Sequence, residues 1–246
     1  MRLYDEIIHD ILTSLEKQDK HILPVGAAAD PVSRDWQDAG KAMMILQSDM
    51  AYELGGHNLP AVGNTLVTTG KDFVPEDEII LIGKDLPEIT EDTPYARIAL
   101  VRVAKDSIGT GDRLYNTIRN IGYFRSHIYP KGFMLRVSSS NDRESVRVEA
   151  EALNEGLNFT AIGNAMLRAL HLHKEVEAVK IIFITDPKVD YGRLQDGLKK
   201  TKQITATIDH MLKDVNMDCG SCGLQEICDE IEGLREMHFG MSEEHT

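Results

Sequence analysis

The stretch VKIIFITDP, residues 179–187, decides the expected fold class. It holds an apolar run that is too short for a typical helix and that ends at Pro187, which is the pattern of a buried strand. Two other β-branched runs, EIILI at 78–82 and RIALVRV at 97–103, are bounded by glycine and proline residues and are expected to be strands as well. These three runs predict a β-sheet within the chain.

Segments expected to be helical surround these strands. They are residues 2–18, 112–128, 142–154, 158–173 and 190–214, and serine, asparagine and aspartate residues that favour an N-cap precede the third of them. FMLRVS at 133–138 is expected to be a further strand. Strands interleaved with helices predict an α/β or α+β fold, in which a mixed sheet is flanked by helices and a small cysteine-rich helical subdomain follows at the C-terminus.

We expect three parts along the chain. Residues 1–40 form an N-terminal helix and loop, and residues 41–214 form the α/β domain. Residues 215–246 hold all three cysteines of the chain and form a cysteine-rich tail.

Composition excludes several classes of protein. The 246 residues are 42% hydrophobic and 27% charged, which fits a globular protein and neither a disordered chain nor a fibre. The formal net charge of −13 disfavours nucleic-acid binding, since general polyanion binders are basic. No apolar stretch approaches the roughly 18 residues of a membrane helix, and acidic residues interrupt the N-terminus where a signal peptide needs an apolar core. We therefore expect no membrane partner and a cytoplasmic location.

Basic residues gather in one segment of this acidic chain. The stretch 97–147 has a local net charge of +6, which suggests a local anionic ligand or an acidic partner. Arginine recognises phosphate and carboxylate groups with two parallel hydrogen bonds. Since the chain has neither a P-loop nor a G-x-G-x-x-G motif, phosphate binding here would depend on side chains. The alternative is that these are ordinary surface arginines. The candidates are Arg113, Arg119, Arg125, Arg136, Arg143 and Arg147.

Cys219, Cys222 and Cys228 have the spacing C-x2-C-x5-C, with glycines between them that allow the backbone to turn. This spacing can direct three thiolates to one iron–sulfur cluster or zinc ion, and His238 is a candidate fourth ligand. The alternatives are a redox-active dithiol and reduced cysteines of no special function.

Several segments are similar to those of one known family. They are ILQSDMAYELGG at 45–56, IILIGKDLPEI at 79–89, TPYARIALVRV at 93–103, the block from FMLRVS to AIGNAML at 133–167, and VKIIFITDP at 179–187. The chain resembles the acetyl-CoA synthase subunit of the carbon monoxide dehydrogenase/acetyl-CoA synthase complex of anaerobic bacteria and methanogenic archaea. It departs from the family pattern at His57 and Lys84, where the family has proline.

The resemblance implies a [4Fe–4S] cluster at Cys219, Cys222 and Cys228, which fall where the family begins its cluster-binding cysteines. In the family this cluster is bridged to a nickel pair that joins a corrinoid-borne methyl group, CO and CoA. This chain has no fourth cysteine and no C-G-C tripeptide for the distal nickel, so the complete catalytic centre is not expected. The family's middle domain carries arginines proposed to bind the CoA phosphates, and residues 102–147 fall in the region that resembles it.

The first hypothesis is an iron–sulfur protein of anaerobic CO and acetyl-CoA metabolism, with an accessory or scaffold role. Its expected partners are subunits of the carbon monoxide dehydrogenase/acetyl-CoA synthase complex or a corrinoid protein. The second hypothesis is an acyl or methyl transferase that binds CoA or another phosphorylated ligand at the arginines. The third is a protein-interaction module with a structural zinc ion at the cysteines.

Overall fold

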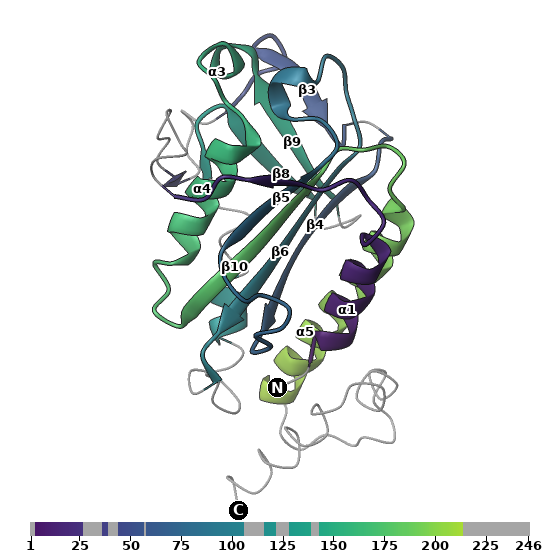
Figure 1. The fold of residues 1–246 in the computed structure, drawn as a ribbon, viewed down its shortest axis with the longest axis vertical. Helices are drawn as coiled ribbons and strands as arrows, with labels where there is room; N and C mark the ends of the chain where they lie inside the picture. Colours follow the sequence, from purple (N-terminus) through teal and green to yellow (C-terminus); the bar gives the residue numbers. More distant parts are fainter. Residues whose placement is uncertain are drawn as a thin grey trace, which may run out of the picture.

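A computed structural model describes residues 3–26, 36–38, 44–56, 58–105, 116–121, 128–138 and 143–213. The predicted α/β class, with mixed pairing of strands flanked by helices, is confirmed (Figure 1). In chain order the elements are α1 (Asp5–Ser14), β1 (His21–Leu23), β2 (Trp36–Asp38), β3 (Met50–Leu54), β4 (Ala61–Thr68), β5 (Glu78–Ile82), the 3-10 helix η3 (Leu86–Glu88), β6 (Tyr95–Val103), β7 (Ile128–Pro130), β8 (Phe133–Ser138), β9 (Arg143–Glu149), α3 (Ala150–Asn154), α4 (Phe159–Leu170), β10 (Val176–Ile184) and α5 (Tyr191–Lys213).

The large sheet has five strands in the order β1-β5-β10-β6-β4. The three apolar runs form its middle strands, and β10 is parallel to β5 but antiparallel to β6. At the edges, β4 pairs in parallel with β6 and β1 pairs antiparallel to β5. Most residues of β4, β5, β6 and β10 are buried, as expected for strands covered on both faces.

Glycine residues allow two of the helices to pack closely against their neighbours. A Cβ atom added to Gly163 of α4 would lie 2.8 Å from the side chain of Ile79 on β5, so only glycine allows this approach. On the other side of the view in Figure 1, α1 packs against α5, where Gly197 faces Ile11. The α1 residue Tyr4 is buried, and its hydroxyl lies 3.0 Å from the Thr205 hydroxyl of α5. No helix among the described residues is long and apolar enough to span a membrane.

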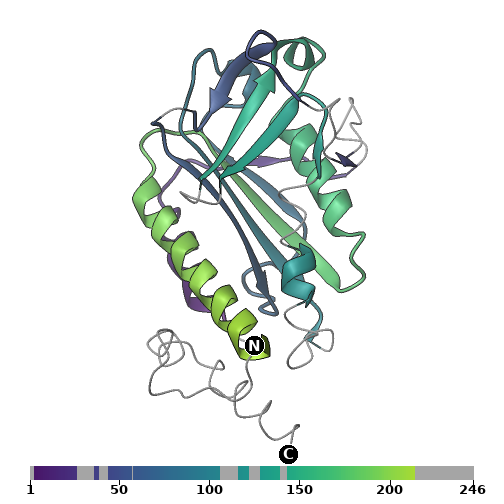
Figure 2. The same cartoon turned by 180° about the vertical axis from the view of Figure 1, so that it is seen from behind.

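A small sheet of three antiparallel strands, in the order β3-β9-β8, lies beyond one end of the large sheet (Figure 2). A separate two-stranded pair joins β2 and β7. Aromatic rings connect the sheets, because Phe159 at the start of α4 contacts rings from both. The centroid of its ring lies 4.5 Å from the ring centroid of Phe183 on β10 and 6.4 Å from that of Phe133 on β8.

The expected helix at 142–154 is wrong over most of its length. Residues 143–149 form β9, and helix α3 covers only 150–154. The sequence RESVRVE alternates in burial with a period of two, with Glu144, Val146 and Val148 buried. Burial of these three side chains on one face of a strand favours β9 more strongly than the preceding N-cap residues favour a helix.

The other expected helices agree more closely with the structure. The expected helix 2–18 is shorter in the structure, α1 covers Asp5–Ser14, and α5 agrees with the helix expected at 190–214. The helix expected at 158–173 is present as α4, and residues 116–121 of the segment 112–128 are helical. The expected cysteine-rich tail, residues 215–246, lies outside the described residues.

Candidate functional site: an arginine-lined pocket on the small sheet

The strand register brings three of the predicted arginines to one face of the small sheet. Arg136 on β8 lies opposite Ser145 on β9, and Ser138 lies opposite Arg143. Arg147 lies between Met134 and Glu53, its partners on the two neighbouring strands. Since side chains alternate between the two faces of a strand, all of these residues share a face. We call it the outer face, because the opposite face carries Leu54, Val146, Val148 and Phe133, which are buried in the core.

Glu53 is an acidic residue of the outer face, and it contacts two of the arginines there. Its Oε1 atom accepts a hydrogen bond from Nη1 of Arg136 and a longer one, at 3.3 Å, from Nε of Arg147. The Glu53 side chain is 7% exposed, whereas that of Arg136 is 44% exposed. Arg147 also donates from Nη1 to the carbonyl of Ile45 at 3.0 Å. The carboxylate is therefore nearly enclosed, while one of its cationic partners reaches solvent.

Arg143 is fixed by the loop that follows β3. Its Nη2 atom donates to the carbonyl oxygens of Gly55 at 2.6 Å and Leu59 at 2.8 Å. Gly55 has a φ of +65°, and a Cβ there would lie 2.5 Å from the Cβ of Ala61. Glycine is required at this position by both the backbone angle and the close approach. The guanidinium of Arg143 is thus oriented before any ligand arrives.

A pocket of about 380 Å³ lies on the outer face. This volume is within the range of small-molecule sites, which is roughly 300–1,000 Å³. The described side chains supply two guanidinium groups, one carboxylate and two serine hydroxyls to it. The described residues that line it are Glu53, Gly55, Gly56, Arg136, Val137, Ser138, Arg143 and Ser145. Cationic forks beside hydroxyl donors suit an anionic group such as phosphate.

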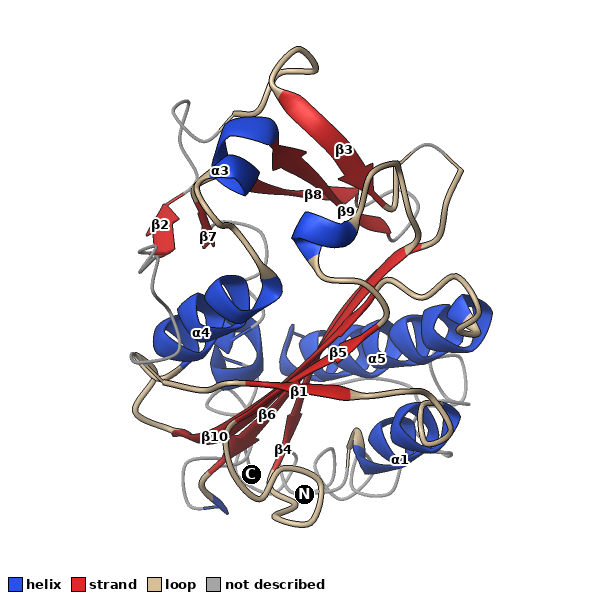
Figure 3. Cartoon of the chain, turned by 45° about the horizontal axis from the view of Figure 1, so that its top comes forward, coloured by secondary structure: helices blue, strands red, loops and turns tan. Residues whose placement is uncertain are grey.

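A buried ion pair joins β9 of the small sheet to β6 of the large sheet. Both strands are labelled in Figure 3. Glu144 on β9 accepts two hydrogen bonds from Arg97 on β6, at 2.7 Å from Nε and 2.8 Å from Nη2. The two side chains are 2% and 0% exposed. Burial would lower the pKa of Arg97, but the charge and hydrogen bonds of Glu144 raise it, so the arginine stays charged. The ion pair therefore anchors the strand that carries Arg143 and Arg147.

Two neighbours show how tightly this junction is packed. A Cβ atom added to Gly63 of β4 would lie 1.9 Å from Oε2 of Glu144. The backbone of β4 can therefore lie this close to the carboxylate only because residue 63 is glycine. The hydroxyl of Tyr95 is buried and has no hydrogen-bond partner among the described residues. Burial raises the pKa of Tyr95 far above its ordinary value, and the charge of Glu144 acts in the same direction. Tyr95 is therefore neutral at physiological pH.

Residues 38–189 match the family model of the CO dehydrogenase/acetyl-CoA synthase complex beta subunit, and this segment is more than half of the chain. The chain belongs to this family. The resemblance expected from the sequence is thereby confirmed, and the protein is related to CO dehydrogenase/acetyl-CoA synthase. The family is named for a subunit of a complex, which implies protein partners. No curated protein matches the chain.

The segment matched to the acetyl-CoA synthase family contains all of the described residues that line the pocket, and it ends before α5. The four cysteine-tail candidates lie beyond this segment and outside the described residues; they are Cys219, Cys222, Cys228 and His238. Within the described part of the chain, no group of three or more histidine, cysteine, aspartate and glutamate residues is placed to hold a metal ion.

The six predicted arginines do not form one cluster in the described structure. Arg136 and Arg143 line the pocket and Arg147 lies beside it, whereas Arg119 is exposed on the helical residues 116–121 and does not line the pocket. Arg113 and Arg125 lie outside the described residues.

Sequence reasoning missed the lining residues Glu53, Ser138 and Ser145, as well as the loop glycines. The signals that indicate them are the period of two in RESVRVE and the E-L-G-G run at 53–56.

Proposed function

We propose that the chain binds CoA, or another ligand that carries a phosphate group, in the pocket on the outer face. Its role would be that of an accessory or scaffold protein of CO and acetyl-CoA metabolism. The observation that carries this proposal is the convergence of Arg136 and Arg143 on one pocket inside the segment that matches the family.

Preorganisation of the pocket supports a binding role. The bonds from Arg143 to two loop carbonyls hold its guanidinium in one orientation, so little side-chain entropy is lost when an anion binds. Arg136 is the more exposed of the two arginines and can adjust to the ligand. Serine hydroxyls at positions 138 and 145 add hydrogen-bonding groups of adaptable direction.

Binding is favoured over group transfer for the pocket itself. Nucleophilic catalysis needs a nucleophile within hydrogen-bond reach of a base, and the base is itself oriented by a third group. Among the described lining residues, the hydroxyls of Ser138 and Ser145 share the pocket with arginines and one carboxylate that is already engaged by Arg136 and Arg147. This arrangement supplies anion recognition rather than an activated nucleophile.

Calorimetric titration of CoA into the full chain tests the proposal. Wild type is compared with Arg136→Ala and Arg143→Ala, and Arg119→Ala is the matched control because it removes an exposed arginine outside the pocket. Each pocket variant is expected to weaken binding about tenfold or more, which corresponds to about 1.4 kcal/mol. Wild-type affinity in both pocket variants, or no binding by wild type, would contradict the proposal.

A second proposed property is an iron–sulfur cluster held by Cys219, Cys222 and Cys228. The spacing C-x2-C-x5-C favours it, since three thiolates can be presented from one short segment. The fourth ligand would be His238, a small molecule or a residue of another chain. Such a cluster would supply electron transfer or, through its incompletely protein-ligated iron, metal transfer. A structural zinc ion is the alternative occupant.

Metal and acid-labile sulfide analysis of anaerobically purified protein tests the cluster. The comparison is a variant with Cys219→Ser, Cys222→Ser and Cys228→Ser. Iron and sulfide present in wild type and lost in the variant would support the cluster. Zinc in their place, with a colourless protein, would favour the interaction module, and no metal in either sample would remove both.

A further inference from the structure

Glu53 is an unusual residue for a pocket that recognises anions, because it places a negative charge in the wall. Its carboxylate lies against Arg136 and Arg147 on the outer face and is 7% exposed. A ligand anion and this carboxylate would therefore compete for the same cations. The inference below rests on the proposed function, because it concerns which phosphate-bearing ligands the pocket accepts.

We propose that Glu53 determines the ligand specificity of the pocket. Its carboxylate occupies the place beside Arg136 and Arg147 that a second anionic group would take. The pocket therefore accepts a ligand that presents one isolated phosphate group and disfavours a pyrophosphate group. In CoA, the phosphate that enters the pocket is then the 3′-phosphate and not the internal pyrophosphate.

The charges that line the pocket support this selectivity. Among the described lining residues, Arg136 and Arg143 supply two positive charges and Glu53 supplies one negative charge, a net charge of +1. A phosphomonoester carries about −1.5 to −2 charges near neutral pH and is close to balanced by such a lining. A pyrophosphate would place additional charge against a carboxylate that is shielded from water, where repulsion between like charges is stronger.

Glu53 is also confined, so it cannot easily withdraw when a larger anion enters. Its backbone N–H donates to the carboxylate of Asp92 at 2.7 Å, which fixes the strand. A Cβ atom added to Gly56 would lie 2.6 Å from Oε2 of Glu53 and 2.9 Å from its Cβ, so the loop backbone packs directly on the side chain. On the other side, Arg147 is held by Glu53 and by the carbonyl of Ile45.

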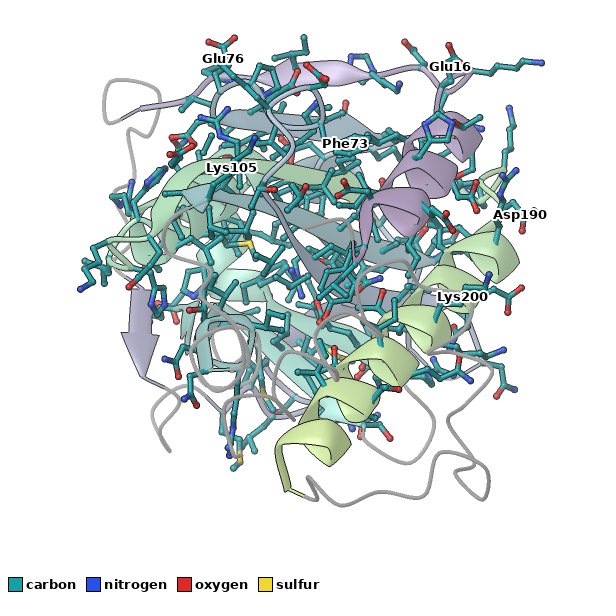
Figure 4. The ribbon with its side chains drawn as sticks, turned by 90° about the horizontal axis from the view of Figure 1, so that it is seen from below. Glu16, Phe73, Glu76, Lys105, Asp190 and Lys200 are labelled. Atoms are coloured by element: carbon teal, nitrogen blue, oxygen red, sulfur yellow. The ribbon has the colours of Figure 1, made fainter. Side chains whose placement is uncertain are left out.

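The test compares inorganic phosphate with inorganic pyrophosphate by calorimetry on the full chain. Glu53→Gln keeps the shape and an oxygen acceptor for the arginines but removes the charge. We expect pyrophosphate to bind about tenfold more tightly in this variant, and phosphate to gain less than about threefold. Glu76→Gln is the matched control, since Glu76 is exposed before β5, at the end of the large sheet away from the small sheet, and appears at the periphery of Figure 4. It should change neither affinity.

A second variant gives a prediction of opposite sign. Arg147→Gln removes a cation that compensates Glu53 without removing a residue that lines the pocket. Pyrophosphate binding should weaken by about threefold more than phosphate binding. Thermal unfolding of each variant checks that the fold is retained. If Glu53→Gln does not fold, the Arg147→Gln variant alone tests the proposal.

The outcomes separate the two proposals. If phosphate and pyrophosphate bind wild type but Glu53→Gln changes both affinities equally, changes neither, or weakens both, the specificity role of Glu53 is overturned while the pocket stands. If neither anion binds wild type or Glu53→Gln, the proposed function fails, and the inference fails with it.

Discussion

The large and small sheets bury their strands in different ways, and the difference explains where the candidate site lies. In the large sheet, β10 has buried residues along nearly its whole length. In the small sheet, β9 buries every second residue and leaves Arg143, Ser145 and Arg147 partly exposed. A strand covered on both faces has no position for an uncompensated charge, whereas a strand covered on one face has many. The pocket accordingly forms on the sheet with one open face.

A buried ion pair joins the two sheets at their junction. The Arg97–Glu144 pair is held by two hydrogen bonds in a place that almost no solvent reaches. Nη1 of Arg97 also donates to the Thr65 hydroxyl at 3.2 Å, which ties in β4. This pair makes the position of β9 depend on the large sheet.

Breaking the junction should have the largest effect. Glu144→Ala leaves the Arg97 guanidinium charged and buried without its partner, and we expect a loss of about 3–5 kcal/mol in the free energy of unfolding. Urea denaturation followed by circular dichroism measures it, with Glu151→Ala as an exposed control on α3. The double variant Arg97→Met with Glu144→Leu should recover most of the loss. A cost below about 1 kcal/mol for Glu144→Ala would mean that the ion pair does not hold the two sheets together.

The next effect concerns the side of the large sheet remote from the pocket. Burial raises the pKa of Tyr4 to about 12, and its hydrogen bond with Thr205 partly opposes this. Between pH 10 and 12 the unfolded chain loses the Tyr4 proton while the folded chain keeps it, so stability is full below pH 10 and falls as the pH rises. The expected slope from this residue is about 1.4 kcal/mol per pH unit. Denaturation from pH 8 to 12 should give a shallower fall for Tyr4→Phe. Identical slopes would show that Tyr4 is not buried against α5.

Arg143→Ala should have a smaller effect on stability. It removes the bonds to the carbonyls of Gly55 and Leu59, and the expected loss is about 1–2 kcal/mol by urea denaturation. Arg143→Lys should recover little, since one ammonium group cannot reproduce the fixed fork of a guanidinium. If lysine restores wild-type stability, the fork geometry does not hold the loop.

Arg119→Ala should have the smallest effect. This arginine is exposed and does not line the pocket, so the free energy of unfolding should change by less than about 0.5 kcal/mol. CoA affinity should also stay at the wild-type value. A tenfold weaker affinity in this variant would move the ligand site from the small sheet to the segment around residues 116–121.

The large sheet could be predicted from the sequence because its strands are continuous apolar runs. The runs at 78–82, 97–103 and 179–186 coincide with β5, β6 and β10 apart from a few end residues. The small sheet could be predicted only in part, since RESVRVE combines helix-favouring N-cap residues before it with an alternation typical of a strand. Its true pattern is clear from the burial of Glu144, which looks like a surface residue until its partner Arg97 is known.

The site depended in part on information that no local pattern holds. Which arginines share a face follows from the local pairing of β8 with β9. The pairing of β3 with β9, which brings Glu53 to them, joins residues about a hundred positions apart. Glu53 has an ordinary charge in the sequence, and its role follows only from its contacts with Arg136 and Arg147. The choice of arginine as the recognising residue type was possible from composition, whereas the choice among the six required the fold.

The most direct test of the central claim is a crystal structure of the full chain grown with CoA. The account predicts density for the 3′-phosphate on the outer face, within hydrogen-bond distance of the guanidinium groups of Arg136 and Arg143, with Glu53 still in contact with Arg147. A phosphate bound at another surface, with the pocket empty in crystals that contain CoA, would contradict it.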